Sequence, residues 1–279
     1  MINWRAYSHL MRFHRPVGIF LLLWPTLWAL WLANRGMPSW RLLVIFILGV
    51  ILTRAAGCIA NDYADRDFDG HVERTKMRPL ATGALSSRQA LIALSVLGLL
   101  ALGLVCLLNP LSIALSVIAA GLALLYPWLK RVTHFPQVAL GLAFAMSVPM
   151  SFAASINALP PLCWLLFAIA VVWPLMYDTA YAINDQVDDA KLGLKSTALW
   201  FGSKSPVFIG ALQSVLIGLW IWLGFITHLN AYFWCALTIH ALGFLYQQYL
   251  LTKNQAFDAF LSNQWLGAIL WLGIALSLS

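Results

Sequence analysis

The chain has 279 residues, of which 62% are hydrophobic and only 10% are charged, and its formal net charge is +7. Soluble domains carry about 25% charged residues, so a soluble fold could not cover the apolar surface of 14 Trp, 15 Phe and 8 Tyr, and disorder is excluded for the same reason. The apolar segments are continuous runs without period-2 alternation, which argues against a β-barrel and predicts an all-α polytopic membrane protein.

Residues 1–16 precede the first long apolar run and mix basic with apolar side chains. Arg5, Arg12 and Arg15 lie among residues such as Trp4 and Phe13, a composition typical of a short helix at a membrane surface. The segment has no convincing cleavage site of small residues, so we expect it to be retained as part of a single 1–279 domain.

Nine apolar runs organise the rest of the chain, each close to the length of about 20 residues that crosses a bilayer. Turn residues such as Asn109-Pro110 and Pro160-Pro161 separate some of the runs, and Pro149 is expected to kink the fifth. The last run is the shortest. The predicted transmembrane helices span residues 17–33, 41–60, 90–108, 111–128, 137–156, 161–182, 207–228, 231–251 and 265–278.

The distribution of the 17 Lys and Arg residues indicates an orientation. With the N-terminus inside the cell, the inside segments hold most of them, whereas the outside loops hold Arg35 and Arg41 and the second span holds Arg54. We therefore expect a multi-pass protein with a cytoplasmic N-terminus, whose net charge needs no nucleic acid to explain it. The inside segments are residues 1–16, 61–89, 129–136, 183–206 and 252–264.

All acidic residues but one lie in two clusters, each at the inner end of an even-numbered span. The first cluster begins the segment 61–89, which we expect to form a cytoplasmic loop. If the second helix continues into it, Asn61, Asp65 and Asp69 follow at i, i+4 and i+8 and share one face with Arg54.

The second cluster has the same character and leads into a second predicted cytoplasmic loop, 183–206. Asp178, Tyr181, Asp185 and Asp189 are spaced at i, i+3, i+7 and i+11, so a helix would present them on one face. Each cluster thus directs several oxygen atoms the same way.

Such clusters are unfavourable without a cation. Two carboxylates about 5 Å apart repel by roughly 3 kcal/mol at an effective dielectric near 20, and the helix dipole disfavours anions at a C-terminus. Mg²⁺ would relieve both effects, because it takes oxygen ligands and is usually shared with a substrate phosphate. Basic residues follow each cluster, as expected for a bound diphosphate. The alternative is a pair of solvated acidic loops neutralised by nearby Arg and Lys.

The motifs Asn61-Asp62-x-x-Asp65-x-x-x-Asp69 and Tyr181-Ala182-x-x-Asp185-x-x-x-Asp189 resemble the aspartate-rich motifs of the UbiA-type intramembrane prenyltransferases. Their surroundings are most similar to the branch of the family that uses 4-hydroxybenzoate in ubiquinone synthesis. The resemblance covers nearly the whole chain. It implies about nine helices around a central cavity with a cytoplasmic cap, in the bacterial inner membrane. It also implies Mg²⁺-dependent transfer of a polyprenyl group from polyprenyl diphosphate to the ring of 4-hydroxybenzoate.

The charge pattern and the resemblance together give the expected site residues. The expected catalytic residues are Asp65, Asp185, Arg54 and Lys130. The expected metal ligands are Asn61, Asp62, Asp65, Asp69, Asp185 and Asp189. The residues expected to bind the diphosphate are Arg15, Arg54, Arg74, Arg78, Lys130, Lys191 and Lys195. The residues expected to bind the aromatic acceptor are Tyr126, Arg131 and Tyr181.

Several of these assignments have a plainer alternative. A charged residue within a span is costly and usually faces a polar cavity, but Arg54 could instead form a structural ion pair. Lys130, Arg131 and Arg15 could simply set the topology. The acceptor could be homogentisate, a naphthoate, a haem or a tetrapyrrole. A transporter that uses the acids as a cation pathway is a further alternative, although transporters usually place such groups near the bilayer midplane.

Overall fold

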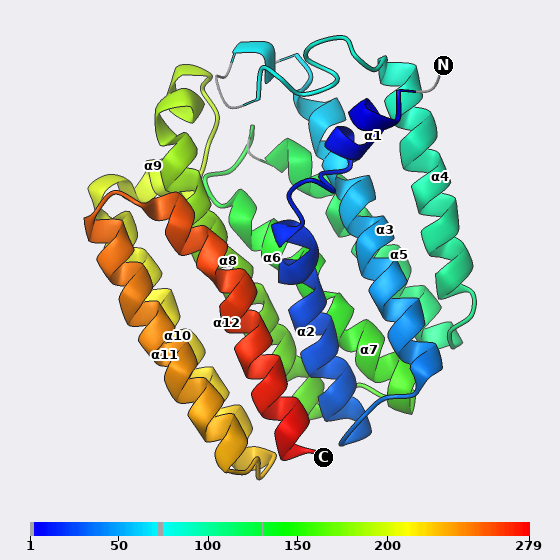
Figure 1. Ribbon diagram of the computed structural model, residues 1–279, viewed down its shortest axis with the longest axis vertical. Helices are drawn as coiled ribbons and strands as arrows, with labels where there is room; N and C mark the ends of the chain where they lie inside the picture. The colour runs from blue at the N-terminus through cyan, green and yellow to red at the C-terminus, as the bar shows by residue number, and fades with distance from the viewer. Residues whose placement is uncertain (1–2, 68, 72–74, 130) are drawn as a thin grey trace.

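The computed structural model describes residues 3–67, 69–71, 75–129 and 131–279, and in these residues the ordered elements are all helices (Figure 1). Short 3-10 turns occur at Asp69–His71 and Gly202–Lys204. The α-helices are α1 (Trp4–Leu10), α2 (Val17–Asn34), α3 (Trp40–Asp65), α4 (Ser87–Val105), α5 (Pro110–Leu129), α6 (Pro136–Ala145), α7 (Ser147–Ile156), α8 (Pro161–Lys191), α9 (Thr197–Phe201), α10 (Ser205–Ile226), α11 (Ala231–Thr252) and α12 (Ala256–Ser277).

Each predicted span coincides with a helix, and the fifth with the pair α6 and α7, which confirms an all-α polytopic membrane protein. In the described part of the chain, eight helical segments are long and apolar enough to cross a membrane. The ninth, α11, is as long as α10 but carries polar side chains, including Gln247. Gln213 of α10 donates to Gln247 over 2.8 Å, and Gln247 donates to Ser262 of α12 over 2.8 Å. These bonds satisfy the amides away from water and join three helices.

The start of the last helix was predicted wrongly, because α12 begins at Ala256 and not at residue 265. Polar residues such as Asp258, Ser262 and Asn263 interrupt the apolar run in its first turns. The structure satisfies them through neighbouring helices: Asn263 accepts a hydrogen bond from the indole of Trp173 over 3.2 Å. Interhelical hydrogen bonds of this kind allow a membrane helix to contain polar residues, so the helix is longer than its apolar run indicates.

Two helices extend beyond their predicted ends. α3 continues to Asp65, and α8 runs for 31 residues to Lys191, so residues 183–191 are helical although they were expected to begin a loop. The fifth span is interrupted between Ala145 and Ser147. Pro149 lies just after this break and cannot donate the backbone hydrogen bond that would continue the helix.

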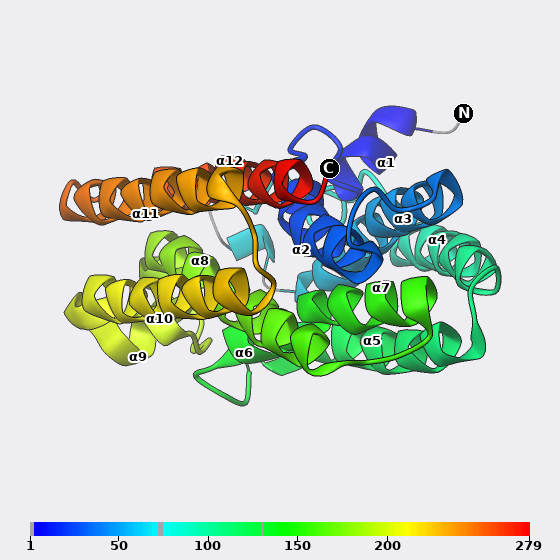
Figure 2. The ribbon, with the colours of Figure 1, turned by 90° about the horizontal axis from the view of Figure 1, so that it is seen from below.

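The largest core lies where α2, α8 and α10 meet. The Trp28 ring lies 4.9 Å from that of Trp173 and 5.0 Å from that of Trp220, centroid to centroid, and all three side chains are buried. α6 packs so closely on α8 that a Cβ at Gly141 would lie 3.3 Å from the Val171 carbonyl carbon and closer still to its oxygen. Seen along the bundle, α2 lies between α12 and α7 (Figure 2).

The connections that carry the acidic motifs lie at one end of the bundle. Figure 1 places the loop after α3 and the turn between α8 and α9 at the same end as α1, whereas the C-terminus lies at the opposite end. Chain ends at opposite ends of the bundle are expected when the chain crosses the membrane an odd number of times. Both motifs therefore lie at the same end of the bundle.

Candidate active site

The first motif begins on the last turns of α3. Ser39 caps the start of this helix by accepting a hydrogen bond from the Leu42 amide, and the helix continues through Asn61 to Asp65. At its far end, Arg131 donates to the carbonyl of Ala64 over 2.6 Å, which satisfies one of the last backbone acceptors of the helix. The predicted continuation is thus confirmed as far as Asp65.

Asp69, expected one further helical turn along, does not lie on α3. The helix ends at Asp65, with Arg66 as its C-cap, and Asp69 begins the 3-10 turn Asp69–His71. Its side chain is nevertheless buried, and Arg78 donates to its two carboxylate oxygens over 2.9 and 2.8 Å. The carboxylate is therefore held by an arginine from the following loop and not by helical register.

A buried network of four charged side chains forms around this turn. Asp62, with 1% of its side chain exposed, lies 2.7 Å from Arg12 and 3.2 Å from Arg78. Burial raises the pKa of the Asp69 carboxyl above its ordinary value, although Arg78 acts in the opposite direction. Burial alone would lower the pKa of Arg78, but Asp62 and Asp69 raise it above its ordinary value, so this guanidinium stays charged.

Arg12 is a residue that sequence reasoning did not place in the site. It was identified as one of the basic residues of the segment 1–16, but no spacing rule connects it to Asp62, which is 50 residues away along the chain. The sequence related the two residues only by their expected location, since both were predicted to lie on the cytoplasmic side.

The second motif lies on a single helix, because α8 continues through residues 183–191, which were expected in a loop. Asp178, Tyr181, Asp185 and Asp189 all belong to α8, so the spacing of i, i+3, i+7 and i+11 places them along one face of it. The chain then folds back against this helix: the hydroxyls of Thr179 and Thr197 lie 2.7 Å apart.

Two electrostatic interactions link the regions of the two motifs. Arg78, from the loop after α3, lies close enough to Tyr181 of α8 for its charge to act on the phenol. The hydroxyl of Tyr126, near the end of α5, lies within range of the charges of Asp178 on α8 and of Asp65 and Arg54 on α3. The three helices thus bring these polar groups together into one region of the molecule.

Arg54 lies beneath the first motif, seven residues before Asn61 on α3. Its Nη1 donates to the Cys58 sulfur over 2.9 Å, while its Nε is buried with no hydrogen-bond partner in the described part of the chain. The guanidinium packs directly on Gly18 of α2, where an added Cβ would lie 2.7 Å from Cζ. A buried donor without a partner is costly and indicates a position where a ligand oxygen can bind.

The oxygen atoms of the first motif fit a magnesium ion. Asn61 Oδ1 and Asp62 Oδ2 are buried acceptors without a hydrogen-bond partner among the described residues. No group of three Asp, Glu, His or Cys side chains in those residues is arranged to hold a metal by itself. Because Mg²⁺ commonly completes its shell with water and substrate phosphate, these residues fit an ion shared with a diphosphate.

Some of the predicted basic residues lie apart from the motifs. Arg15 is exposed in the connection between α1 and α2, and Lys191 is 69% exposed and pairs with Asp188 over 3.4 Å. Lys195 donates to the Val132 carbonyl over 3.0 Å, which connects the segment after α8 to the α5–α6 connection. Arg74 and Lys130 lie outside the described residues.

The three residues expected to bind the acceptor differ in their surroundings. Tyr126 lies within range of the acids and of Arg54, and the Tyr181 ring packs 5.0 Å from that of Phe260. Arg131, besides its bond to Ala64, stacks on the Trp128 ring with its Cζ 4.8 Å from the ring centroid.

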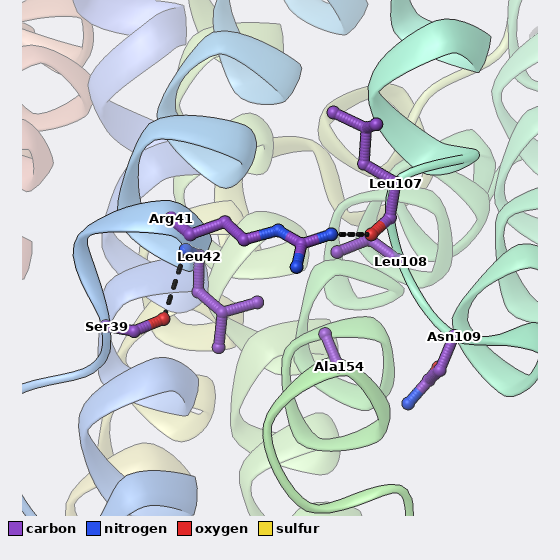
Figure 3. A pocket seen from close by; sticks show the side chains of 7 residues that line it. All are labelled: Ser39, Arg41, Leu42, Leu107, Leu108, Asn109 and Ala154. Atoms are coloured by element: carbon purple, nitrogen blue, oxygen red, sulfur yellow. Dashed lines mark hydrogen bonds between the residues drawn. The ribbon is translucent and has the colours of Figure 1, made fainter.

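Two surface pockets lie away from these side chains. A pocket of about 310 Å³ lies at the opposite end of the bundle, where Arg41 donates to the Leu107 carbonyl over 2.8 Å, just beyond the end of α4 (Figure 3). A second pocket, of about 210 Å³, lies between α1 and residues 77–84, with Arg5 and His9 in its wall. Neither is lined by an acid of the motifs.

Comparisons with known proteins agree with this architecture. The model of the UbiA prenyltransferase family matches residues 22–273. A 4-hydroxybenzoate octaprenyltransferase from Alkalilimnicola ehrlichii is 51% identical over 275 residues, which cover 98% of this chain and 94% of that protein. The protein of the same name from Hydrogenovibrio crunogenus is 52% identical over 275 residues, which cover 98% of this chain and 96% of that one.

Solved structures share the fold. The apo structure of a UbiA homolog from Aeropyrum pernix K1 superposes with a TM-score of 0.83 at 25% identity, covering 93% of this chain and 97% of that one. A UbiA homolog from Archaeoglobus fulgidus bound to GPP and Mg²⁺ superposes with a TM-score of 0.77 at 18% identity, covering 98% of this chain and 99% of that one.

Proposed function

Because the chain belongs to the UbiA prenyltransferase family, we propose that it transfers a polyprenyl group from a polyprenyl diphosphate to the ring of 4-hydroxybenzoate, with Mg²⁺, in ubiquinone biosynthesis. Relatives named for transfer to this acceptor are about half identical to the chain over nearly its whole length, which supports the choice of acceptor. The observation that carries the proposal is that both motifs lie at one end of the bundle, where Arg78 of the loop after α3 lies within electrostatic range of Tyr181 on α8.

The proposed diphosphate site lies between the two motifs. Asn61, Asp62 and Asp65 from α3 and Asp185 and Asp189 from α8 supply oxygen atoms, and Mg²⁺ shared with the diphosphate would neutralise the departing charge. The unpartnered oxygens of Asn61 and Asp62 support this role. Asp69 is held by Arg78 on both oxygens, so its contribution is to fix the loop.

The protein contributes to this reaction mainly by positioning the two substrates and by stabilising the charge that develops on them. The allylic C–O bond of the donor breaks, both bonding electrons leave with the diphosphate, and the ring carbon ortho to the phenol oxygen attacks the resulting cation. Loss of the proton from that carbon restores aromaticity. Arg54 has an unpartnered Nε below the first motif, where it can donate to a diphosphate oxygen as charge develops on it. The Phe260 ring, 5.0 Å from that of Tyr181, has no oxygen atom that could capture the cation as a carboxylate would.

We assign the site to the cytoplasmic side of a bacterial inner membrane. The basic residues concentrate in segments at the same end as α1 and the two motifs, as the positive-inside rule requires of cytoplasmic segments. This location suits a donor whose tail dissolves in lipid and whose diphosphate does not. Reporter fusions at the two chain ends test it: the N-terminal fusion should report the cytoplasm and the C-terminal fusion the opposite side.

The alternative functions have less support. A transporter is disfavoured because the family model covers most of the chain and because the acids lie at helix ends. Prenyl transfer to homogentisate, a naphthoate, a haem or a tetrapyrrole remains the alternative within the family, and an acceptor panel addresses it.

The deciding experiment is prenyl transfer by purified protein in lipid nanodiscs. Octaprenyl diphosphate and each acceptor of the panel are supplied with Mg²⁺, with EDTA, or with EDTA followed by excess Mg²⁺. The expected result is Mg²⁺-dependent prenylation of 4-hydroxybenzoate, lost with EDTA and restored by added Mg²⁺. Turnover that is unaffected by EDTA, or transfer to another acceptor but not to 4-hydroxybenzoate, contradicts the proposal.

A further inference from the structure

The two oxygens of the Asp62 carboxylate have different surroundings. Oδ1 accepts from Arg12 over 2.7 Å and lies 3.2 Å from Nη1 of Arg78. Oδ2 is buried and has no hydrogen-bond partner among the described residues, in a side chain only 1% exposed. Two cations therefore fix one oxygen, and the other remains available as an acceptor in a place where an unsatisfied oxygen is costly.

The backbone at Arg12 is unusual for an arginine. Its φ is +61°, in the left-handed region, and it follows directly on the last turn of α1, where its amide donates to the His9 carbonyl over 3.1 Å. Glycine is preferred at such a helix end because it adopts this conformation without strain. The guanidinium also donates from Nη1 to the His9 carbonyl over 3.2 Å, so it is held on one side by α1 and on the other by Asp62.

α1 itself is fixed against the helix that carries the first motif. Ala6 and Leu10 of α1 are buried in a cluster with Ala55 and Ile59 of α3. Ile59 precedes Asp62 by less than one helical turn. The position of Arg12 relative to Asp62 is therefore set by packing between two helices and not by a flexible tail.

We propose that Arg12 is a positioning residue of the candidate active site. By holding Oδ1 of Asp62, it keeps Oδ2 available to a magnesium–diphosphate complex. Through Arg12, residues 3–16 therefore contribute to the binding of this complex. This inference rests on the proposed function for the identity of that complex. The competing explanation is that the ion pair only anchors α1 to the bundle.

The variants Arg12→Gly and Arg12→Lys separate these explanations. Arg12→Gly removes the guanidinium but suits the left-handed backbone, so the turn after α1 is preserved. Arg12→Lys restores a cation that can reach Oδ1. Arg5→Ala is the matched control, because Arg5 is an exposed cation of α1, the helix that Arg12 follows, and lines the neighbouring surface pocket.

The main readout is binding of Mn²⁺, as a spectroscopic substitute for Mg²⁺, to full-length protein with geranyl diphosphate and no aromatic acceptor, followed by electron paramagnetic resonance. Loss of one charge-assisted hydrogen bond to a buried carboxylate should weaken Mn²⁺ binding by about tenfold in Arg12→Gly. Arg12→Lys should recover most of this loss, and Arg5→Ala should bind as the unmodified chain does. Thermal unfolding measured in parallel reports whether α1 has detached.

The inference is overturned if Arg12→Gly binds Mn²⁺ as tightly as the unmodified chain, or if Arg5→Ala weakens binding equally. It is also overturned if Arg12→Lys fails to improve on Arg12→Gly while its unfolding temperature is normal. Failure of the proposed function is a separate result: the unmodified chain would bind Mn²⁺ and geranyl diphosphate but prenylate no aromatic acceptor. In that case, the Arg12 comparison still decides the positioning role.

Discussion

Gly18→Ala tests the role of Arg54 without changing any charge. Gly18 lies in the first turn of α2, and the Arg54 guanidinium packs on it, so that an added methyl would lie 2.7 Å from Cζ and closer to Nε and Nη2. Non-bonded carbon atoms separate by about 3.5 Å or more, so Cζ must move by about 1 Å. The atoms that move are at the end of a flexible side chain, and the fold is preserved.

A displacement of this size has a calculable effect. A misplacement of about 1 Å can cost about 100-fold in rate, which corresponds to about 2.7 kcal/mol of transition-state stabilisation. Stability should change little, because alanine is favoured over glycine in a helix by up to about 1 kcal/mol. We therefore expect kcat/KM for the polyprenyl diphosphate to fall by about 100-fold while the unfolding temperature is maintained.

Gly49→Ala is the control for this variant. Gly49 lies on α3, the helix of Arg54, but a Cβ there would meet nothing within 4 Å. Its steady-state kinetics with 4-hydroxybenzoate should match those of the unmodified chain. Near-normal kcat/KM in Gly18→Ala, or an equal loss in Gly49→Ala, would refute the assignment of Arg54 to the diphosphate.

Three further predictions concern the acids, the acceptor and pH. Asp65→Asn and Asp185→Asn should each lower kcat by at least about 100-fold in the nanodisc assay, because each removes a carboxylate proposed to bind the metal; near-normal kcat in a folded variant would refute that role. Arg131→Ala should raise KM for 4-hydroxybenzoate more than KM for the diphosphate, and a selective rise in the diphosphate KM would reassign it. The side chain of His14 is exposed but partly desolvated, and this desolvation, followed by the charge of His9, lowers its pKa below 6.5. Neutral His14 therefore contributes stability above that pH, and this contribution is lost as the pH falls through the lowered value. His14→Gln should flatten the acid-side fall in unfolding temperature, and parallel curves would contradict this.

The apolar pattern predicted most of the fold because lipid requires long helices. Runs near 20 residues indicated the spans, and the spacing of Asp178, Tyr181 and Asp185 indicated a common face of α8. The start of α12 could not be predicted in this way. Asn263 looks unfavourable in a span until its bond to Trp173 is known, and that bond depends on packing between two helices.

Only those features of the site that depend on residue spacing along one helix could be predicted from the sequence. The helical register of Asn61 and Asp65 follows from their separation in the sequence. The ion pairs that bury Asp62 and Asp69 do not, because Arg12 and Arg78 reach them through the packing of α1 and the course of a loop. Similarly, no pattern links Arg131 to the end of α3, where it donates to a backbone carbonyl.

The central claim is that α3 and α8 hold one magnesium–diphosphate complex between them. A structure of the chain in lipid, with Mg²⁺ and an unreactive polyprenyl thiodiphosphate, tests this directly. We expect density for metal and diphosphate that contacts Asp65 on one side and Asp185 on the other, with Arg54 Nε within hydrogen-bonding distance of a phosphate oxygen. Diphosphate density at any other place, or in contact with one helix alone, would contradict the account.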